Sequence, residues 1–188
     1  MKWRPVLTER PDVYRPLARA LHWLTAILVI ATIPVGAVMV EDGLPRALQN
    51  GLFIFHKNVG VILILLVLLR LIYRAAHAPP PLPASVPDWQ RKVADLTHGL
   101  LYLLLLVMGV SGYVRVAAGG FPIETLDALG VPPLVPRSDA LAETAKAIHF
   151  YVRFALIALI LLHVGAALQH LFSRADGIFA RMWPAAGR

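Results

Sequence analysis

The stretch that decides the fold is residues 147–172, which read AIHFYVRFALIALILLHVGAALQHLF. The run is almost entirely apolar, and a helix of this length, rising about 1.5 Å per residue, crosses the hydrocarbon core of a bilayer. It carries His149 near its start and His163 near its end. Along a helix these two residues lie roughly 21 Å apart and within about 40° of each other around the axis. One span therefore presents two imidazoles to the same side, one near each membrane surface.

Three more apolar runs precede this stretch. The chain has 188 residues, of which 58% are hydrophobic, a share too high for an ordinary soluble domain. Long apolar runs at residues 18–40, 52–73 and 96–118 join residues 147–172 as candidate spans. We expect one all-α membrane domain over residues 1–188, built as a bundle of four transmembrane helices. Residues 119–136, rich in proline, are expected to form a short cap over one end.

The basic residues predict the orientation of the bundle. Positive residues concentrate on the cytoplasmic side of membrane proteins. Twelve lie on the side that holds both termini: Lys2, Arg4, Arg10, Arg15, Arg19, Arg70, Arg74, Arg91, Lys92, Arg174, Arg181 and Arg188. Five lie on the other side: Arg46, Lys57, Arg115, Arg137 and Lys146. We therefore expect both termini in the cytoplasm. Because these charges flank apolar spans, the net charge of +7 is no sign of nucleic-acid binding.

The histidines sort into two depths when the four spans alternate in direction. His56 opens the second span and His149 opens the fourth, so these two share the outer level. The inner level has four candidates: His22, His98, His163 and His170. We favour His22 with His163, which lie deeper in their spans, and keep His98 with His170 as the alternative pair.

Two facing imidazoles at each level indicate a particular cofactor. Zinc takes three or four protein ligands, whereas the iron of a b-type haem needs only two axial imidazoles. The sequence contains no cysteine, which excludes iron–sulfur clusters and covalent c-type haem. We therefore expect two haem b groups, held by His56 with His149 and by His22 with His163. The flat porphyrins also need space between the helices. The small residues that could provide it are Gly60, Gly109, Gly112, Gly165 and Ala166.

Other polar residues near the spans have possible roles around such haems. Arg153 lies one turn after His149 and is a candidate partner for a haem propionate, with the outer lipid headgroups as the alternative. His98 and His170, if they bind no iron, are candidates to hydrogen-bond a quinone or to carry protons. Lys57 and Arg115 are candidates to attract an anionic substrate. Arg70 and Arg74, at the end of the second span, are expected to extend to the lipid headgroups.

Several stretches resemble the bacterial cytochrome b561 family. They are RALHWLTAILV at residues 19–29, FHKNVGV at 55–61, LTHGLLYLLLLVMGVSGY at 96–113, IHFYVRF at 148–154 and LLHVGAALQHLF at 161–172. The resemblance covers nearly the whole chain. It implies a four-helix, di-haem b cytochrome of the bacterial inner membrane, with His22 and His163 on the cytoplasmic-side haem and His56 and His149 on the periplasmic-side haem.

The resemblance also implies an activity. The chain resembles in particular those members that act as superoxide oxidases, which pass an electron from periplasmic superoxide to membrane ubiquinone. We therefore expect an oxidoreductase with superoxide as donor and ubiquinone as acceptor. One alternative is a cytochrome b anchor subunit that serves a periplasmic dehydrogenase or hydrogenase as its partner redox protein. Another is a transporter or proton channel without haem.

Overall fold

The computed structural model describes residues 13–174 and 176–183. These residues form helices, turns and loops, without a strand. The elements in chain order are α1 (Pro16–Val38), α2 (Arg46–Ala76), α3 (Asp88–Ala118), the short α4 (Glu124–Ala128), α5 (Asp139–Gln169), a π-helical turn η1 (His170–Arg174) and a 3₁₀ turn η2 (Phe179–Arg181).

Four of these helices are long and apolar enough to cross a membrane: α1, α2, α3, and α5 continued by η1. The predicted all-α, four-span fold is confirmed. The helices α2, α3 and α5 have 31 residues each, so they extend beyond the predicted spans. A proline marks the start of three helices. Pro16 lies in the first turn of α1, and Pro45 and Pro87 lie directly before α2 and α3. Such positions suit proline because it has no N–H to leave unpaired.

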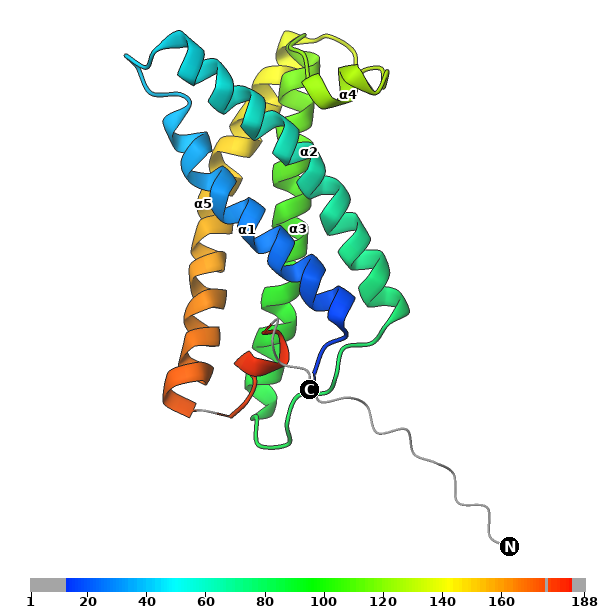
Figure 1. The fold of residues 1–188 in the computed structure, drawn as a ribbon, viewed down its shortest axis with the longest axis vertical. Coiled ribbons are helices and arrows are strands. Elements are labelled where there is room, and N and C mark those ends of the chain that lie inside the picture. Colours follow the sequence, from blue (N-terminus) through cyan, green and yellow to red (C-terminus); the bar gives the residue numbers. More distant parts are fainter. Residues whose placement is uncertain (1–12, 175, 184–188) are drawn as a thin grey trace, which may run out of the picture.

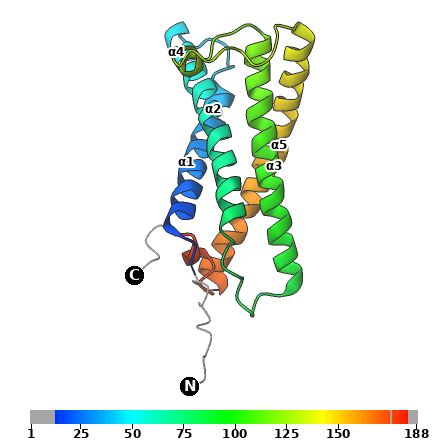
Figure 2. The same ribbon diagram turned by 90° about the vertical axis from the view of Figure 1, so that its right-hand side faces the viewer.

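The close backbone packing runs between α1 and α2, between α2 and α3, and between α3 and α5. Figure 2 shows α1 and α2 on one side of the bundle and α3 and α5 on the other. At one point α2 and α3 approach closely enough that a Cβ on Gly109 would collide with the side chain of Ile64. Gly109 thus serves helix packing, and α5 meets α1 and α2 through side chains.

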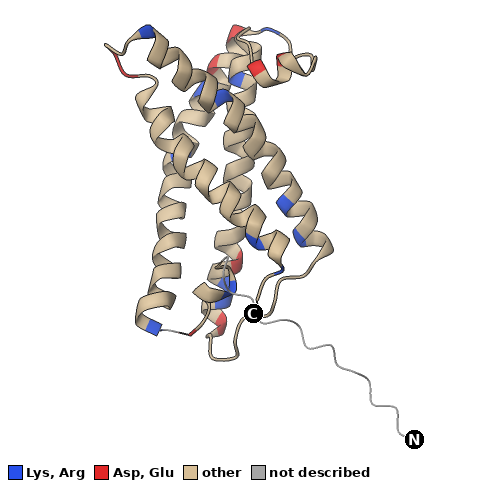
Figure 3. Cartoon of the chain, in the orientation of Figure 1, with Lys and Arg blue, Asp and Glu red and all other residues tan. Residues whose placement is uncertain are grey.

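The surface of the bundle is apolar along most of its length. Large side chains such as Ile30, Leu65, Leu103 and Leu161 are exposed on the four long helices. Figure 3 shows that charged residues gather toward the two ends of the helices and leave the middle nearly free of them. This pattern is that of a lipid-facing surface.

The first and last described segments meet at one end of the bundle (Figure 1). The backbone N–H of Tyr14 donates to the carbonyl of Arg181 at 3.1 Å, and the indole Nε1 of Trp23 donates to the carbonyl of Met182 at 2.8 Å. We call this the inner end. Lys2, Arg4, Arg10 and Arg188, which contributed to the predicted orientation, lie outside the described residues.

The opposite, outer end carries α4 and the start of α5 (Figure 1). The helix α4 lies within the segment predicted to cap the bundle, and it contacts α2. The helix α5 begins after Ser138, whose Oγ accepts a hydrogen bond from the N–H of Leu141, as an N-cap residue does.

Candidate functional site

The outer imidazole pair joins α2 to α5. The ring centres of His56 and His149 lie 6.2 Å apart with an interplanar angle of 79°. Two imidazoles on opposite sides of one metal ion have ring centres about 6 Å apart, given metal–nitrogen bonds of about 2 Å. The separation therefore fits one metal between the two rings.

The ring of His149 is held in the tautomer that a metal needs. Its Nδ1 lies 3.0 Å from the backbone carbonyl of Met108 and 3.3 Å from Oγ of Ser111. Because a carbonyl oxygen only accepts, Nδ1 carries the proton and the lone pair is on Nε2. Histidines that bind metals usually donate their other N–H in this way. His149 is thus oriented for ligation by its neighbours on α3.

His56 is held less firmly. Its Nδ1 is buried beside the backbone of Thr32 and makes no well-formed hydrogen bond with the described residues. Two glycines make room for the outer pair. A Cβ on Gly36 would lie 2.7 Å from Cε1 of His56, and one on Gly112 would lie 3.1 Å from Cε1 of His149. Gly112 was among the predicted small residues, whereas Gly36 was missed because nothing in its sequence context links it to a histidine.

The inner pair joins α1 to α5 at a matching distance. The ring centres of His22 and His163 are 6.3 Å apart, with an interplanar angle of 66°. The same ring of His163 also touches His98 of α3, at 5.4 Å between ring centres. That distance is short for two ligands on opposite sides of one metal. Of the two neighbours of His163, His22 therefore has the better geometry for a shared metal.

An arginine lies against the inner pair. Nη2 of Arg70 is 3.1 Å from Nδ1 of His22, and its guanidinium lies 5.3 Å from the ring centre of Tyr102. The sequence predicted that Arg70 would reach the lipid headgroups. That prediction is wrong, because the side chain is half-buried and contacts the histidine of a neighbouring helix.

His170 lies apart from this cluster. In the π-helical turn that follows α5, its Nδ1 bonds Oδ2 of Asp176 at 2.7 Å, and both side chains are largely buried. The hydrogen bond from His170 lowers the pKa of Asp176, although burial of the carboxyl acts in the opposite direction. The alternative pair of His98 with His170 has no ring contact in the structure, since His98 meets His163 and His170 meets Asp176.

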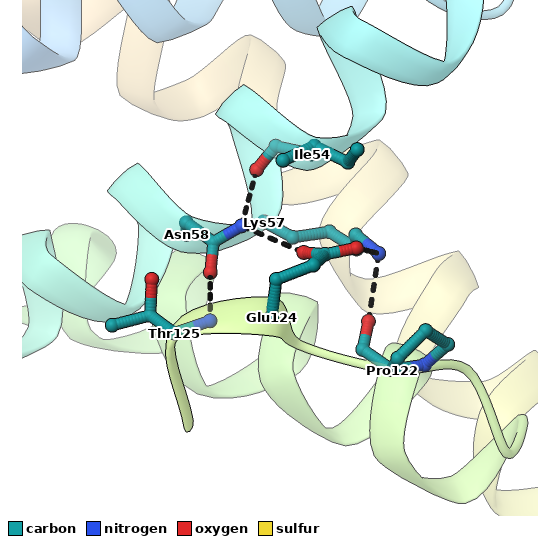
Figure 4. Close-up of polar contacts among 6 residues, drawn as sticks. All are labelled: Ile54, Lys57, Asn58, Pro122, Glu124 and Thr125. Atoms are coloured by element: carbon teal, nitrogen blue, oxygen red, sulfur yellow. Dashed lines mark hydrogen bonds and ion pairs between the residues drawn. The ribbon is translucent and has the colours of Figure 1, made fainter. Parts of the chain in front are cut away.

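A cluster of polar side chains next to His56 fastens α4 to α2 (Figure 4). Nζ of Lys57 donates to the carbonyl of Pro122 at 2.7 Å and to Oε1 of Glu124 at 2.8 Å. Asn58 donates to Oε2 of Glu124 at 2.7 Å and accepts from the N–H of Thr125 at 2.8 Å. We call these residues the α4 latch. Only 14% of the Lys57 side chain is exposed, and its charge is compensated by the carboxylate of Glu124. Lys57 therefore has little uncompensated charge with which to attract an anion.

The other two cations of the outer half have different surroundings. Arg115 of α3 is half-buried and acts electrostatically on both His56 and His149. Arg153 stacks on two exposed rings, 4.1 Å from the centre of Phe150 and 4.6 Å from that of Phe154. Arg115 thus lies near both rings of the outer pair, whereas the face of the Arg153 guanidinium is covered by aromatic rings.

The donor set suits a cofactor with two axial ligands. Within residues 13–174 and 176–183, no group of three or more His, Cys, Asp or Glu side chains is arranged to hold a metal ion. Each facing pair supplies two imidazoles from different helices, and in the outer pair His149 is already in the tautomer for iron, with glycines beside both outer rings. These residues fit haem b.

Comparisons with known proteins identify the family. The chain matches the model of the prokaryotic cytochrome b561 family over residues 13–185. It is 33% identical to cytochrome b561 homolog 2 of Escherichia coli over 93% of each chain, and 30% identical to cytochrome b561 homolog 1 of that organism over 87% of this chain and 93% of that protein. The probable superoxide oxidase CybB of Yersinia pestis is 26% identical over 91% of this chain and 96% of its own. The chain therefore belongs to the prokaryotic cytochrome b561 family, multi-pass membrane proteins that bind haem b and transfer electrons.

Proposed function

We propose that this protein holds two haem b groups and transfers electrons from superoxide at the outer end to ubiquinone at the inner end. One observation carries the proposal. Two imidazole pairs have ring centres 6.2 Å and 6.3 Å apart, and each pair has one histidine on α5. His56 with His149 hold the outer haem iron, and His22 with His163 hold the inner one. We assign the whole sequence to one membrane domain around these sites.

A haem iron with two imidazole ligands exchanges single electrons without a change of ligands. Because two imidazoles from different helices would hold each iron, the haems would carry electrons without binding oxygen. The two ligands on α5 are about 21 Å apart along the helix, which sets the levels of the two sites. The bundle thus provides two electron-carrying positions across one membrane.

The choice of superoxide as donor rests on the relative named as a probable superoxide oxidase. Superoxide gives up one electron and leaves as oxygen, so two superoxide ions reduce one quinone to quinol with the uptake of two protons. Because Lys57 is paired with Glu124, Arg115 is the cation that we assign to attracting the anion. With the basic residues predicting both termini in the cytoplasm, the outer end faces the periplasm of a bacterial inner membrane.

The acceptor site is assigned to the inner end. His98 touches His163, one of the proposed inner ligands, and lies within the span where a membrane quinone has access. The contact between His170 and Asp176 supports a role for His170 in carrying the protons that quinone reduction consumes. We assign these two histidines to quinone binding and proton supply.

The first experiment is haem quantitation on the purified full chain, with a reduced-minus-oxidised spectrum. Two b haems per chain are expected. A protein that stays colourless after expression with ample haem contradicts the proposal and favours a transporter.

The second experiment supplies superoxide to the purified protein with a soluble ubiquinone and follows quinol formation. Quinol that forms faster than in a control with added superoxide dismutase supports superoxide as donor. A two-haem protein that is inactive alone, but is isolated with a catalytic partner, contradicts that donor and favours the anchor subunit of a dehydrogenase or hydrogenase.

A further inference from the structure

Arg70, a half-buried cation, lies against the inner pair, and its contact with His22 conflicts with iron binding. Arg70 lies in the membrane-spanning part of α2 and contacts Nδ1 of His22, while Tyr102 supplies a ring face. None of the ion pairs formed within the described residues includes Arg70. A guanidinium stays charged in proteins, and a charge inside a membrane is costly unless an anion or a polar group compensates it.

The contact with His22 does not suit iron ligation. A guanidinium only donates hydrogen bonds, so Nδ1 of His22 must accept, and in a neutral ring the proton is then on Nε2. A neutral imidazole that binds iron through Nε2 carries its proton on Nδ1, which would point at the N–H groups of Arg70. Both arrangements cannot exist together. When His22 binds iron, Arg70 must therefore find another acceptor.

We propose that Arg70 binds a propionate of the inner haem and so positions that haem and tunes its potential. The inference rests on the proposed function, in that it needs a haem between His22 and His163. Arg70 is within reach because it already touches one of the two ligands. A carboxylate is the anion that a guanidinium fork matches best, through two parallel hydrogen bonds. Arg70 would thus serve the inner haem in the way that the sequence suggested for Arg153 at the outer haem.

The test compares Arg70→Gln, Arg70→Lys and Arg74→Gln in the full chain purified with haem. Arg74 lies one turn further along the same helix, so Arg74→Gln removes the same charge at greater distance. The readouts are haem per chain and a potentiometric titration of each haem. His149→Ala, which is expected to keep only the inner haem, identifies which potential belongs to it.

Arg70→Gln is expected to lower the potential of the inner haem or to remove that haem, because loss of the cation leaves the propionate charge uncompensated and favours the ferric state. The outer haem is expected to keep its potential. Arg70→Lys retains the charge but not the two parallel hydrogen bonds, so its inner haem potential is expected to lie between those of wild type and Arg70→Gln. If Arg70→Gln does not accumulate in the membrane, the potential of Arg70→Lys is the test. Arg74→Gln is expected to resemble wild type.

Two results would overturn the proposal: Arg70→Gln with both haems at wild-type potentials, or Arg74→Gln with the same shift as Arg70→Gln. A wild-type chain without an inner haem would instead overturn the proposed function, so the two failures are distinguishable.

Discussion

The two imidazole pairs have nearly the same spacing and very different surroundings. At the outer pair, the carbonyl of Met108 orients His149, and glycines lie against both rings. At the inner pair, Arg70 donates to His22, and His98 lies against His163. The hydrogen bond from His149 to Met108 thus suits metal binding at the outer pair, whereas at the inner pair His22 must first lose its hydrogen bond from Arg70. The comparison teaches that ring spacing alone does not describe a ligand site, because the partner of the second ring nitrogen sets the tautomer.

The largest expected effect is selective loss of one haem. His149→Ala should remove the outer haem and keep the inner one, and His22→Ala should do the reverse, because each change removes one of two axial ligands. Haem per chain should fall from two to one in both variants. His77→Ala is the control, since His77 stacks on Tyr73 at the end of α2, away from both pairs. Equal loss of both haems in either variant would mean that the sites do not load independently.

The next effect concerns the inner pair alone. His98→Ala should keep both haems, because His22 has the spacing for a shared metal with His163 and His98 does not. Quinone reduction should become several-fold slower if His98 contacts the quinone. Haem quantitation and a quinol assay check the two parts separately. If His98→Ala removes a haem while His22→Ala keeps both, the inner ligands are His98 and His163.

A steric change sharpens the description of the outer pair. Gly36→Leu should displace the ring of His56 and weaken outer haem binding at least ten-fold, since even a Cβ at this position lies 2.7 Å from the ring. Gly51→Leu on α2 is the matched control, because Gly51 is exposed and a Cβ there meets no atom within 4 Å. Titration of the apoprotein with haem measures the haem affinity of both variants. Similar losses in the two variants would indicate a general effect of leucine on the bundle.

A smaller change is expected from Ser111→Ala. Its Oγ lies 3.3 Å from Nδ1 of His149, but the carbonyl of Met108 remains as acceptor at 3.0 Å. A hydrogen bond of this kind contributes about 1 kcal/mol. We expect a slight shift in the outer haem potential and none in the inner one. A shift at the inner haem in a redox titration would show that the two sites are coupled.

The smallest effect is that of pH on the α4 latch. Burial raises the pKa of Glu124, but hydrogen bonds from Lys57 and Asn58 outweigh it, so the net pKa lies below the ordinary 4.5. The latch therefore adds stability above that pH and loses it as the pH falls through the lowered pKa. Because Glu124 is partly exposed, the contribution is at most about 1 kcal/mol. Wild type should lose slightly more thermal stability than Glu124→Gln when the pH falls from neutral to acidic. Equal losses would show that the carboxylate does not stabilise α4.

The spans and the histidine levels were predictable from local pattern. Apolar runs of the right length specify membrane helices without reference to their neighbours, because lipid requires every backbone group to be paired within the helix. Helical spacing then assigned His149 and His163 to one side of α5. The rings of both pairs expected from depth face each other, and the ring of His98 also meets that of His163.

The partners of charged side chains were not predictable. Arg70 was expected at the headgroups and lies against His22, while Lys57 was expected to face an anionic substrate and is bound to Glu124. Gly36 gave no local signal, although His56 packs directly on it. Each of these contacts joins residues from different helices, so helical spacing within one segment contains no information about them.

The sequence by itself determined the membrane fold, the four spans and the depth of each histidine, since hydrophobic length and the rise of a helix are local properties. Only the tertiary structure decided which ring nitrogen is protonated in His149 and in His22, which arginine lies near which pair and how α4 is held. Those features depend on how α1, α2, α3 and α5 rotate against one another. That rotation is set by side-chain packing across the whole bundle.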